Sequence, residues 1–374
     1  MINVLSLVPY NFLPPKMGGQ KGIAFFNDFF SKTVSLTCVS VKKNDVAAAK
    51  NYEVLPLLSN SKLRYINIFY FFTLKKLIKE KQVTHLVVEH PYYGWLGFLL
   101  KQFCGIKLII HSHNIESVRF RSIGKWWWRI LWQYEKFTYR QANTIFFVTE
   151  EDKDFAIAKF NIVSSKCHTI TYGIEIEKIP SSEERLYAKK QLQQLHHIGE
   201  QEKILLFNGT LDYQPNLDGV EAILKNINPL LLADNNLKYK IIICGKGLPS
   251  GYNELKDFGQ KNIIYAGFVD DINIYFKGAD IFINPVTDGG GIKTKLVEAL
   301  GNNLSVVSTK SGAIGVPGAL TRNKMFVADD FAWADFAKAI RETDTTLDTP
   351  VLFFDHFYWG SICKKASVIL TEIA

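Results

Sequence analysis

Cysteine is scarce in this sequence, with five residues among 374, and no two of them form a CxxC pair. An odd, scattered set argues against a disulfide framework and against a zinc ribbon. Most of these residues lie in apolar, strand-like runs, so we expect buried free thiols and a reducing compartment. The five residues are Cys38, Cys104, Cys167, Cys244 and Cys363.

Long hydrophobic runs are missing as well. The most apolar stretch, residues 66–74, is interrupted by Asn67 and followed by two lysines, whereas a membrane-spanning helix needs ~20 apolar residues. The N-terminus has no basic start, and its apolar run is too short for a signal peptide. We therefore expect a cytoplasmic protein, either soluble or peripheral on the inner face of the membrane.

Several motifs of hydrolases and nucleotide-binding proteins are also absent. The sequence contains no paired carboxylates, no GxSxG, no HExxH and no Walker-type GxxxxGK[ST]. The lack of a carboxylate pair weighs against ordinary glycoside hydrolysis, which usually needs two such groups.

The overall composition is that of a folded protein. Hydrophobic residues make up 47% of the chain and aromatic residues 13%, which excludes disordered and collagen-like classes. At roughly 150 residues per domain, the length indicates two or three domains. The net charge of +8 suits nucleic acid, an anionic membrane or a phosphorylated ligand. No nucleic-acid recognition motif accompanies the charge, so we expect no nucleic-acid partner.

Short β-branched runs alternate with helical patterns in two series, and a polar stretch at 181–202 lies between them. Apolar strands that alternate with helices indicate parallel sheets covered on both faces. We therefore expect an α/β protein with two doubly wound, Rossmann-like domains. Such sheets bind ligands beyond the carboxyl ends of their strands, which places the site in a cleft between facing domains. Strands are expected at 3–8, 35–41, 85–89, 107–111, 144–148, 204–207, 240–244, 263–265, 281–284 and 305–308, and helices at 22–31, 66–79, 95–103, 127–141, 150–160, 216–232, 254–260 and 294–301.

The strongest motif is DGGGIKTKLVE at residues 288–298, between an expected strand and an expected helix. Three glycines let the backbone approach a ligand closely, and a helix N-terminus attracts anions. Lys293 and Lys295 add positive charge, and Glu298 is placed to accept hydrogen bonds from a sugar diol. A phosphate site next to a group that binds a sugar diol is typical of a nucleotide-binding site. The alternative is a tight turn with a solvated lysine–glutamate pair.

Two further segments end expected strands of the first domain. Gly18 and Gly19 follow the first strand, where a βα turn binds phosphate or sugar; the alternative is a plain loop. His111 and His113 end the strand at 107–111. No third ligand at metal-like spacing accompanies them, so we expect them to contact a sugar rather than a metal. We expect one of the two histidines to point into the core, and we favour His113 as the outward one.

In the second domain, residues 245–247 and 267–271 also end strands. Either segment could line a pocket for a base. The alternative for each is helix-cap chemistry, with Asp270 or Asp271 as the N-cap.

A cluster of tryptophans and basic residues lies at 121–140. Three consecutive tryptophans, Trp126, Trp127 and Trp128, cannot all face one way on a helix. At least one is therefore exposed or engages a partner, and the basic residues favour an anionic membrane or a lipid-linked acceptor. The alternative is a helix whose tryptophans pack on the sheet.

These motifs together resemble the family 4 glycosyltransferases, which are retaining enzymes of the GT-B fold. Residues 289–299 resemble a subgroup with a GGGI-K/R-x-K-x-x-EA signature. Residues 207–220 resemble the start of its second domain, and 18–19, 111–116, 243–247, 266–271 and 307–309 follow in matching order. The segment at 357–359 resembles a closing helix. This implies an acceptor-side domain at 1–190, a nucleotide-sugar domain at 191–350 and a helix at 351–374 that crosses back to the first domain.

The resemblance implies a hexosyltransferase-like enzyme that moves a sugar from a nucleotide diphosphate-sugar to a glycan or lipid-linked acceptor, in cell-surface polysaccharide synthesis. The donor is a substrate, and neither a cofactor nor a metal is expected. The resemblance places His113, Asp288 and Gly290 at the reacting sugar. It places the donor against Gly18, Gly19, Gly209, Gly245, Val269, Gly289, Gly291, Ile292, Lys293, Lys295 and Glu298.

The chain departs from the family pattern at two places. The family has a glutamate eight residues before its ribose-binding glutamate, and Gly290 stands there, so Asp288 or backbone N–H groups must hold the sugar. The family's basic pair early in the second domain is replaced by Thr210 and residues 214–216, which leaves Lys293 and Lys295 to bind the diphosphate. Two other functions stay open: a nucleotide-sugar epimerase of the same fold, and a non-catalytic GT-B binding protein.

Overall fold

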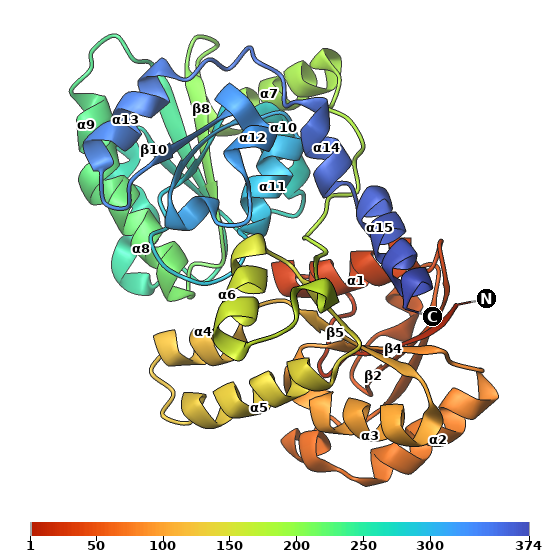
Figure 1. Ribbon diagram of the computed structural model, residues 1–374. Helices are drawn as coiled ribbons and strands as arrows, with labels where there is room; N and C mark the ends of the chain where they lie inside the picture. The colour runs from red at the N-terminus through yellow and green to blue at the C-terminus, as the bar shows by residue number, and fades with distance from the viewer. Residues whose placement is uncertain (1, 374) are drawn as a thin grey trace. The chain divides into compact units, whose positions relative to one another are not determined.

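In the computed structural model, which describes residues 2–373, the two alternating series form two separate parallel sheets (Figure 1). Contacts divide the chain into two units. The first unit comprises the residues up to Glu175, Gly290–Ile292 and those from His356 onward; the second comprises Ile176–Gly289 and Lys293–Asp355.

The first unit contains a seven-stranded sheet with the order β3-β2-β1-β4-β5-β6-β7. Its strands are β1 (Asn3–Leu7), β2 (Ser35–Val41), β3 (Glu53–Leu58), β4 (His85–Glu89), β5 (Lys107–Ser112), β6 (Thr144–Phe147) and β7 (Cys167–Thr169). Its helices are α1 (Gly18–Phe30), α2 (Phe69–Glu80), α3 (Gly94–Cys104), α4 (Glu116–Ser122), α5 (Trp128–Gln141), α6 (Glu150–Phe160) and α15 (Trp359–Glu372). Every residue of β4 and β6 is buried, as expected for central strands with helices on both faces.

The second unit contains a six-stranded sheet with the order β10-β9-β8-β11-β12-β13. Its strands are β8 (Lys203–Asn208), β9 (Tyr239–Cys244), β10 (Ile263–Gly267), β11 (Ile281–Asn284), β12 (Ser305–Thr309) and β13 (Met325–Ala328). Its helices are α7 (Ser182–His196), α8 (Gln214–Ala222), α9 (Asn228–Leu232), α10 (Ile272–Gly278), α11 (Thr294–Gly301), α12 (Gly318–Thr321) and α13 (Trp333–Glu342); α14 (Val351–Phe357) contains the return to the first unit.

The contacts divide the chain after Glu175, whereas the sequence placed the boundary after residue 190. The difference arises from α7, which packs on α10 of the second unit. The two helices approach so closely that a Cβ on Gly278 would lie 2.8 Å from the backbone of Ala188. Lys189 also forms an ion pair with Asp280 at 2.7 Å. The polar composition of this stretch therefore belongs to a surface helix rather than to a linker.

The end of the chain completes the first unit. Helix α15 packs on α1, where Trp359 contacts Phe26 with ring centroids 6.3 Å apart. Gly173 has to be a glycine here, because a Cβ on it would lie 2.5 Å from the Trp359 ring. A parallel bridge between Ile174 and Tyr358 fixes the start of the helix.

Each sheet reverses its strand order beside its first strand. In the first sheet the reversal lies between β1 and β4, and in the second between β8 and β11. Loops leave these two strands in opposite directions, which opens a crevice at the carboxyl edge where doubly wound sheets bind ligands. These two edges contain the predicted site residues.

Candidate functional site

Glycines follow three neighbouring strands of the second sheet at its carboxyl edge. The N–H group of Gly209, after β8, donates to the carbonyl of Cys244 at 3.0 Å. The N–H group of Gly245, after β9, donates to the carbonyl of Gly267 at 2.7 Å, and the hydroxyl of Tyr265 donates to the Gly245 carbonyl at 2.9 Å. The three turns therefore form one hydrogen-bonded edge.

One of these glycines is required by close packing with the backbone. Gly245 has a φ of +149°, and a Cβ on it would lie 1.8 Å from the carbonyl oxygen of Gly209, so no larger residue fits there. A Cβ on Gly209 would lie 2.7 Å from the ammonium nitrogen of Lys295, so a larger residue there would displace that side chain.

Lys295, in the first turn of α11, reaches across the reversal point of the second sheet. Its Nζ donates to the carbonyl of Asn208 at 2.6 Å and to Oδ1 of Asn216 at 2.9 Å. Burial, helped by the neighbouring charge of Lys293, lowers the pKa of Lys295 to about 7. The ammonium group thus lies in the β8–α8 turn, where the sequence showed no basic residue.

The glycine-rich loop before α11 is closed by its own lysine. Lys293 is the N-cap residue of α11, and its Nζ donates to the carbonyl of Gly289. Burial lowers the pKa of Lys293 to about 8, although the carboxylate of Asp288 partly opposes this shift. Gly289 and Gly291 have φ values of +92° and +72°, which favour glycine, whereas a Cβ on Gly290 would meet open space.

The other predicted donor residues lie on or beside these elements. Ile292 directly precedes the N-cap of α11, and Glu298 lies half-buried on the same helix. Val269 lies between β10 and α10, where Asp271 caps the helix by accepting from the N–H of Asn273 at 2.9 Å. The cap chemistry offered as an alternative for this segment is therefore present.

A hollow of about 470 Å³ lies beside the ends of β9 and β10. Its lining includes Gly247 and Tyr265, and the rest of its wall comes from residues 248–256. This is the part of the edge where the sequence placed a pocket for a base.

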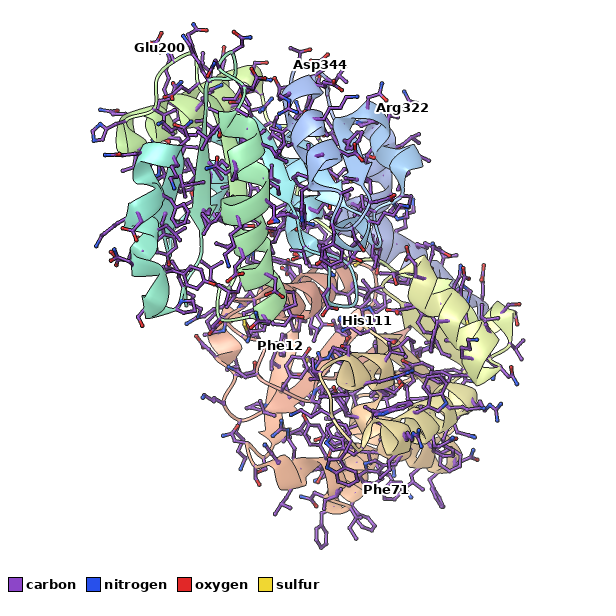
Figure 2. The ribbon with its side chains drawn as sticks, turned by 90° about the vertical axis from the view of Figure 1, so that its left-hand side faces the viewer. Phe12, Phe71, His111, Glu200, Arg322 and Asp344 are labelled. Carbon is purple, nitrogen blue, oxygen red and sulfur yellow. The ribbon has the colours of Figure 1, made fainter. Side chains whose placement is uncertain are left out.

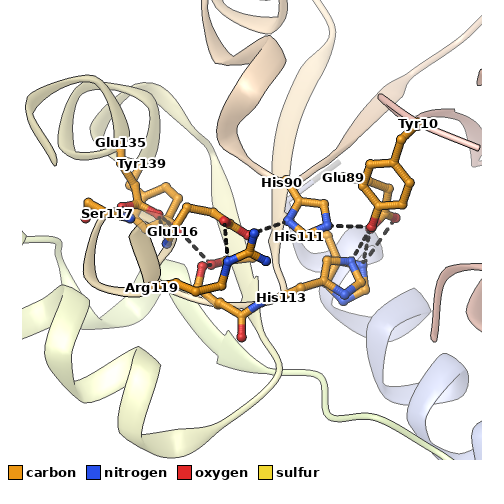
Figure 3. A network of polar contacts seen from close by, with 12 residues as sticks. Tyr10, Glu89, His90, His111, His113, Glu116, Ser117, Arg119, Glu135 and Tyr139 are labelled. Carbon is orange, nitrogen blue, oxygen red and sulfur yellow. Dashed lines mark hydrogen bonds and ion pairs between the residues drawn. The ribbon is translucent and has the colours of Figure 1, made fainter. Parts of the chain in front are cut away.

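The first sheet carries a network of buried polar side chains at its own reversal point (Figure 3). Tyr10, after β1, contacts Nε2 of His90 through its hydroxyl at 2.8 Å. The Nδ1 of His90 lies 3.0 Å from Oε1 of Glu116, at the start of α4. The backbone of His90 has φ +62° and ψ 162°, a strained conformation of the kind that concentrates at functional sites.

His111 and His113 share the carboxylate of Glu89, the last residue of β4. The Oε2 atom of Glu89 lies 3.1 Å from Nδ1 of His111 and 2.6 Å from Nε2 of His113. His113 is the more exposed of the two, but the prediction that one ring points into the core and the other outward was wrong, because both rings reach the same carboxylate. Residues two apart in a strand lie on one face of the sheet. Glu89 is also a third possible ligand that the spacing in the sequence did not reveal, because its oxygen lies within 4.8 Å of both ring nitrogens.

The N-terminal glycines lie inside a helix rather than in a loop. Helix α1 begins at Gly18, four residues earlier than expected, and the side-chain oxygen of Gln20 accepts from the N–H groups of Lys16 and Met17. Glycine is a poor helix former, which hid this first turn in the sequence. Gly18 and Gly19 still lie where the chain enters α1 from the carboxyl side of β1.

Of the three consecutive tryptophans, one is largely exposed. Trp126 is 82% exposed, Trp127 packs on the ring of Phe120, and Trp128 lies within 5.0 Å of the Arg121 guanidinium. In the described residues, 2–373, no helix combines the length and apolarity needed to cross a bilayer.

Tyr10, Glu89 and His90 were not predicted as site residues. A signal was present in the sequence, because Glu89 and His90 directly follow the apolar run at 86–88 and precede Pro91. Their partners come from β1, β5 and α4, which are 22–80 residues away.

Comparisons with known proteins bear on both units. Residues 34–178 match the family model described as Glycosyltransferase Family 4, and residues 202–343 match the model described as Glycosyl transferases group 1. A protein of Klebsiella pneumoniae, described as an uncharacterized 44.6 kDa protein in the cps region, is 30% identical over 132 residues. The match covers 34% of this chain and 34% of that protein, so the chain spans about a third of the relative's length.

Two solved structures extend the likeness to nearly the whole chain. HepE of Anabaena, solved in complex with UDP, has 13% identity and a TM-score of 0.71, over 99% of this chain and 100% of that one. WaaG, described as a glycosyltransferase involved in lipopolysaccharide biosynthesis, has 14% identity and a TM-score of 0.65, over 98% of this chain and 99% of that one. At these identities the likeness shows the fold. The two family models, one matching each unit, support a family 4 glycosyltransferase, and the structural likeness shows the GT-B fold.

Proposed function

We propose that the chain transfers a sugar from a nucleotide diphosphate-sugar to a glycan or lipid-linked acceptor, with retention of configuration, in cell-surface polysaccharide synthesis. The observation that carries the proposal is the reach of Lys295 from α11 to Asn208 and Asn216. This contact puts a cation at the reversal point of the second sheet, beside the glycine-rich loop. A diphosphate is the ligand that such an edge suits best.

The departing diphosphate would be stabilised by groups that are already in place. The loop before α11 offers backbone N–H groups, and the helix N-terminus adds positive potential. The N–H group of Gly289 donates to Oδ1 of Asp288 at 2.6 Å, so it would have to exchange that partner for the diphosphate. Lys293 and Lys295 supply the charge that the family's missing basic pair would have supplied. Preorganised donors of this kind stabilise the charge that develops on a leaving group. We therefore propose that turnover needs no metal.

The nucleoside would occupy the neighbouring part of the same edge. Glu298 on α11 is proposed to accept hydrogen bonds from the ribose, and the hollow beside Gly247 and Tyr265 is proposed to hold the base. The HepE complex with UDP, which has the same fold, supports a uridine diphosphate donor. In the first unit, His113 and the glycines that open α1 are proposed to position the sugar. Asp288 and Gly290 are proposed to lie at the sugar carbon that reacts.

The proposed acceptor is supported by one protein of similar structure and by exposed side chains of the first unit. WaaG, involved in lipopolysaccharide biosynthesis, supports a saccharide acceptor. Exposed apolar side chains beside basic ones support peripheral binding to an anionic membrane. Trp126 is one of them. Phe69 and Phe72 on α2 are 69% and 64% exposed and lie two turns and one turn before Lys75 and Lys76. Figure 2 shows side chains projecting into solvent around Phe71.

A panel of nucleotide sugars tests the proposal, first by thermal shift and then by turnover. A ligand present at 100 times its dissociation constant adds about 2.7 kcal/mol of stability, which a thermal shift detects. Release of the nucleoside diphosphate, with the sugar moved to acceptor or water, is the expected result. Interconversion of two nucleotide sugars without an acceptor would instead identify an epimerase. Tight binding without any turnover would identify a non-catalytic binding protein.

A further inference from the structure

One buried carboxylate holds two imidazole rings at the carboxyl edge of the first sheet. Glu89 is fully buried at the end of β4, and its Oε2 atom lies 2.6 Å from Nε2 of His113 and 3.1 Å from Nδ1 of His111. Figure 3 shows both rings turned toward this carboxylate. An ionised carboxylate has no hydrogen to donate, so each imidazole must donate through the nitrogen that faces it.

We infer that Glu89 is a positioning residue that holds His113 as its Nε2–H tautomer, so that the Nδ1 atom of His113 accepts a hydrogen bond from a substrate hydroxyl. A histidine that donates through one ring nitrogen leaves the other nitrogen as an acceptor, as long as the ring is neutral. The partner of one nitrogen therefore decides what the other can bind.

The ionisation of both groups agrees with this assignment. Burial would raise the pKa of Glu89, but the positive charge that His111 and His113 carry when protonated, together with their hydrogen bonds, outweighs it and holds the pKa well below its usual range. Burial and the neighbouring His111 and His90 lower the pKa of His113 to about 4, against the opposing effect of Glu89. At neutral pH the carboxylate is therefore ionised and the His113 ring is neutral.

The ring of His113 is also fixed in orientation. His90 stacks on it with centroids 4.5 Å apart and planes 22° from parallel. His90 is itself held at both nitrogens, by the Tyr10 hydroxyl and by Glu116. The His113 ring is stacked on one face and hydrogen-bonded at Nε2, so its Nδ1 atom points in one fixed direction.

The chemistry of the bound group follows from the acceptor. Within residues 2–373, no hydrogen bond to Nδ1 of His113 is found, and the side chain is 13% exposed. An acceptor nitrogen recognises a hydroxyl and disfavours phosphate or carbonyl oxygen, which have no proton to give. We therefore assign the His113 position to a hydroxyl of the sugar, an assignment that rests on the proposed function, whereas the tautomer does not.

Nuclear magnetic resonance on the full chain labelled with ¹⁵N-histidine tests the tautomer without any substrate. The signals of His113 are identified by their loss in His113→Asn. We expect a protonated Nε2 and an unprotonated Nδ1 at pH 7. Protonation of Nδ1, or of both nitrogens, would overturn the inference even if the enzyme proves to be a glycosyltransferase.

A matched pair of variants tests the role of Glu89. A glutamine offers one acceptor oxygen and two N–H donors, so it cannot hold both rings as the carboxylate does. In Glu89→Gln we expect both ¹⁵N shifts of His113 to move toward the averaged values of an exchanging imidazole. Glu53→Gln, an exposed change on β3, should leave them unchanged. Unmoved shifts in Glu89→Gln would refute the positioning role; if this variant does not fold, the wild-type spectrum still decides.

A double-mutant cycle on kcat/KM connects the tautomer to the substrate, with the donor that the nucleotide-sugar panel identifies. We expect Glu89→Gln and His113→Ala each to lower kcat/KM about tenfold, and the double variant to lose no more than His113→Ala alone, because one hydrogen bond is lost in each case. A hundredfold loss in the double variant would show that Glu89 acts independently of His113.

Discussion

The ammonium group of Lys295 lies 2.6 Å from the carbonyl oxygen of Asn208, although the two residues are 87 positions apart. Asn208 ends β8, and Lys295 follows β11, the next strand of the sheet. The contact bridges the point where strand order reverses. It places the cation in the turn where the family pattern has its basic pair.

Lys295→Met should weaken the binding of a nucleoside diphosphate roughly ten- to a hundredfold. A charge-assisted hydrogen bond contributes ~1.5–3 kcal/mol, and 1.4 kcal/mol corresponds to a factor of ten. Calorimetry with UDP measures the change. Lys225→Met is the matched control, because Lys225 forms an exposed pair with Glu221.

The same titrations can separate phosphate from ribose contacts. Glu298→Ala should weaken the nucleoside monophosphate as well as the diphosphate, since its proposed contact is to ribose. If Lys293→Ala and Lys295→Met both bind the diphosphate like wild type, the phosphate site lies elsewhere.

The affinity for a nucleoside diphosphate should fall as the pH rises from about 7 to 9. Burial lowers the pKa of Lys295 to about 7 and that of Lys293 to about 8, so the free protein loses both positive charges across this range. A bound anion favours the ammonium forms and raises both pKa values, so binding at pH 8 should take up protons. Calorimetry in buffers of different ionisation enthalpy measures this uptake; constant affinity with no proton uptake would contradict it.

Turnover should survive excess EDTA, because the lysines and backbone N–H groups take the place of a metal. The grouping of Glu89 with His111 and His113 makes the experiment informative, since these residue types also bind divalent cations. Complete loss of activity in EDTA, restored by Mn²⁺, would refute metal independence.

Gly245→Ala should destabilise the protein by about 2–6 kcal/mol, since overpacking and a left-handed backbone each cost about 1–3 kcal/mol. The added Cβ would lie 1.8 Å from the backbone oxygen of Gly209. Gly251→Ala, where a Cβ would meet open space, is the control. Thermal unfolding should show a lower midpoint for Gly245→Ala alone; equal midpoints would mean that the turn adjusts.

Sedimentation with anionic vesicles should show binding that weakens as salt is added, because salt screens the attraction of lysines and arginines. Trp126→Ala should reduce the bound fraction, and Trp127→Ala, which changes a ring packed on Phe120, should reduce it less. Phe69→Ala with Phe72→Ala tests the exposed row on α2. Absence of binding at low salt would remove the membrane from the proposal.

The central strands could be predicted from the sequence, and most strands at the sheet edges could not. The missed strands β3, β7 and β13 are all edge strands. β3 contains Pro56, which is tolerated at an edge, and β7 has three residues. β13 is apolar throughout but has four residues, two of them exposed, and Pro56 interrupts β3, so neither shows the long buried apolar run that identifies a central strand.

The site residues likewise fall into a group that could be predicted from the sequence and a group that could not. The glycine-rich loop and its lysines form a local motif, so their place could be predicted. The network of Tyr10, Glu89 and His90 joins residues from strands far apart in the chain, and its geometry depends on strand order and register. The register of these strands cannot be derived from a single sequence. The position of the Glu89 carboxylate between His111 and His113 could therefore not be predicted.

The packing of α15 on α1 also bears on how the protein is made. A ribosome releases the N-terminal part first, so the second unit is fully synthesised before Trp359 and Cys363 emerge to cover Phe26. Domains generally fold as units during synthesis. The second unit can therefore fold before α15, the last helix of the first unit, has been synthesised. A chain that terminates early, before residue 359, should therefore yield a protein with an intact second unit and an uncovered aromatic surface on α1. Such products should be prone to aggregation and to capture by chaperones.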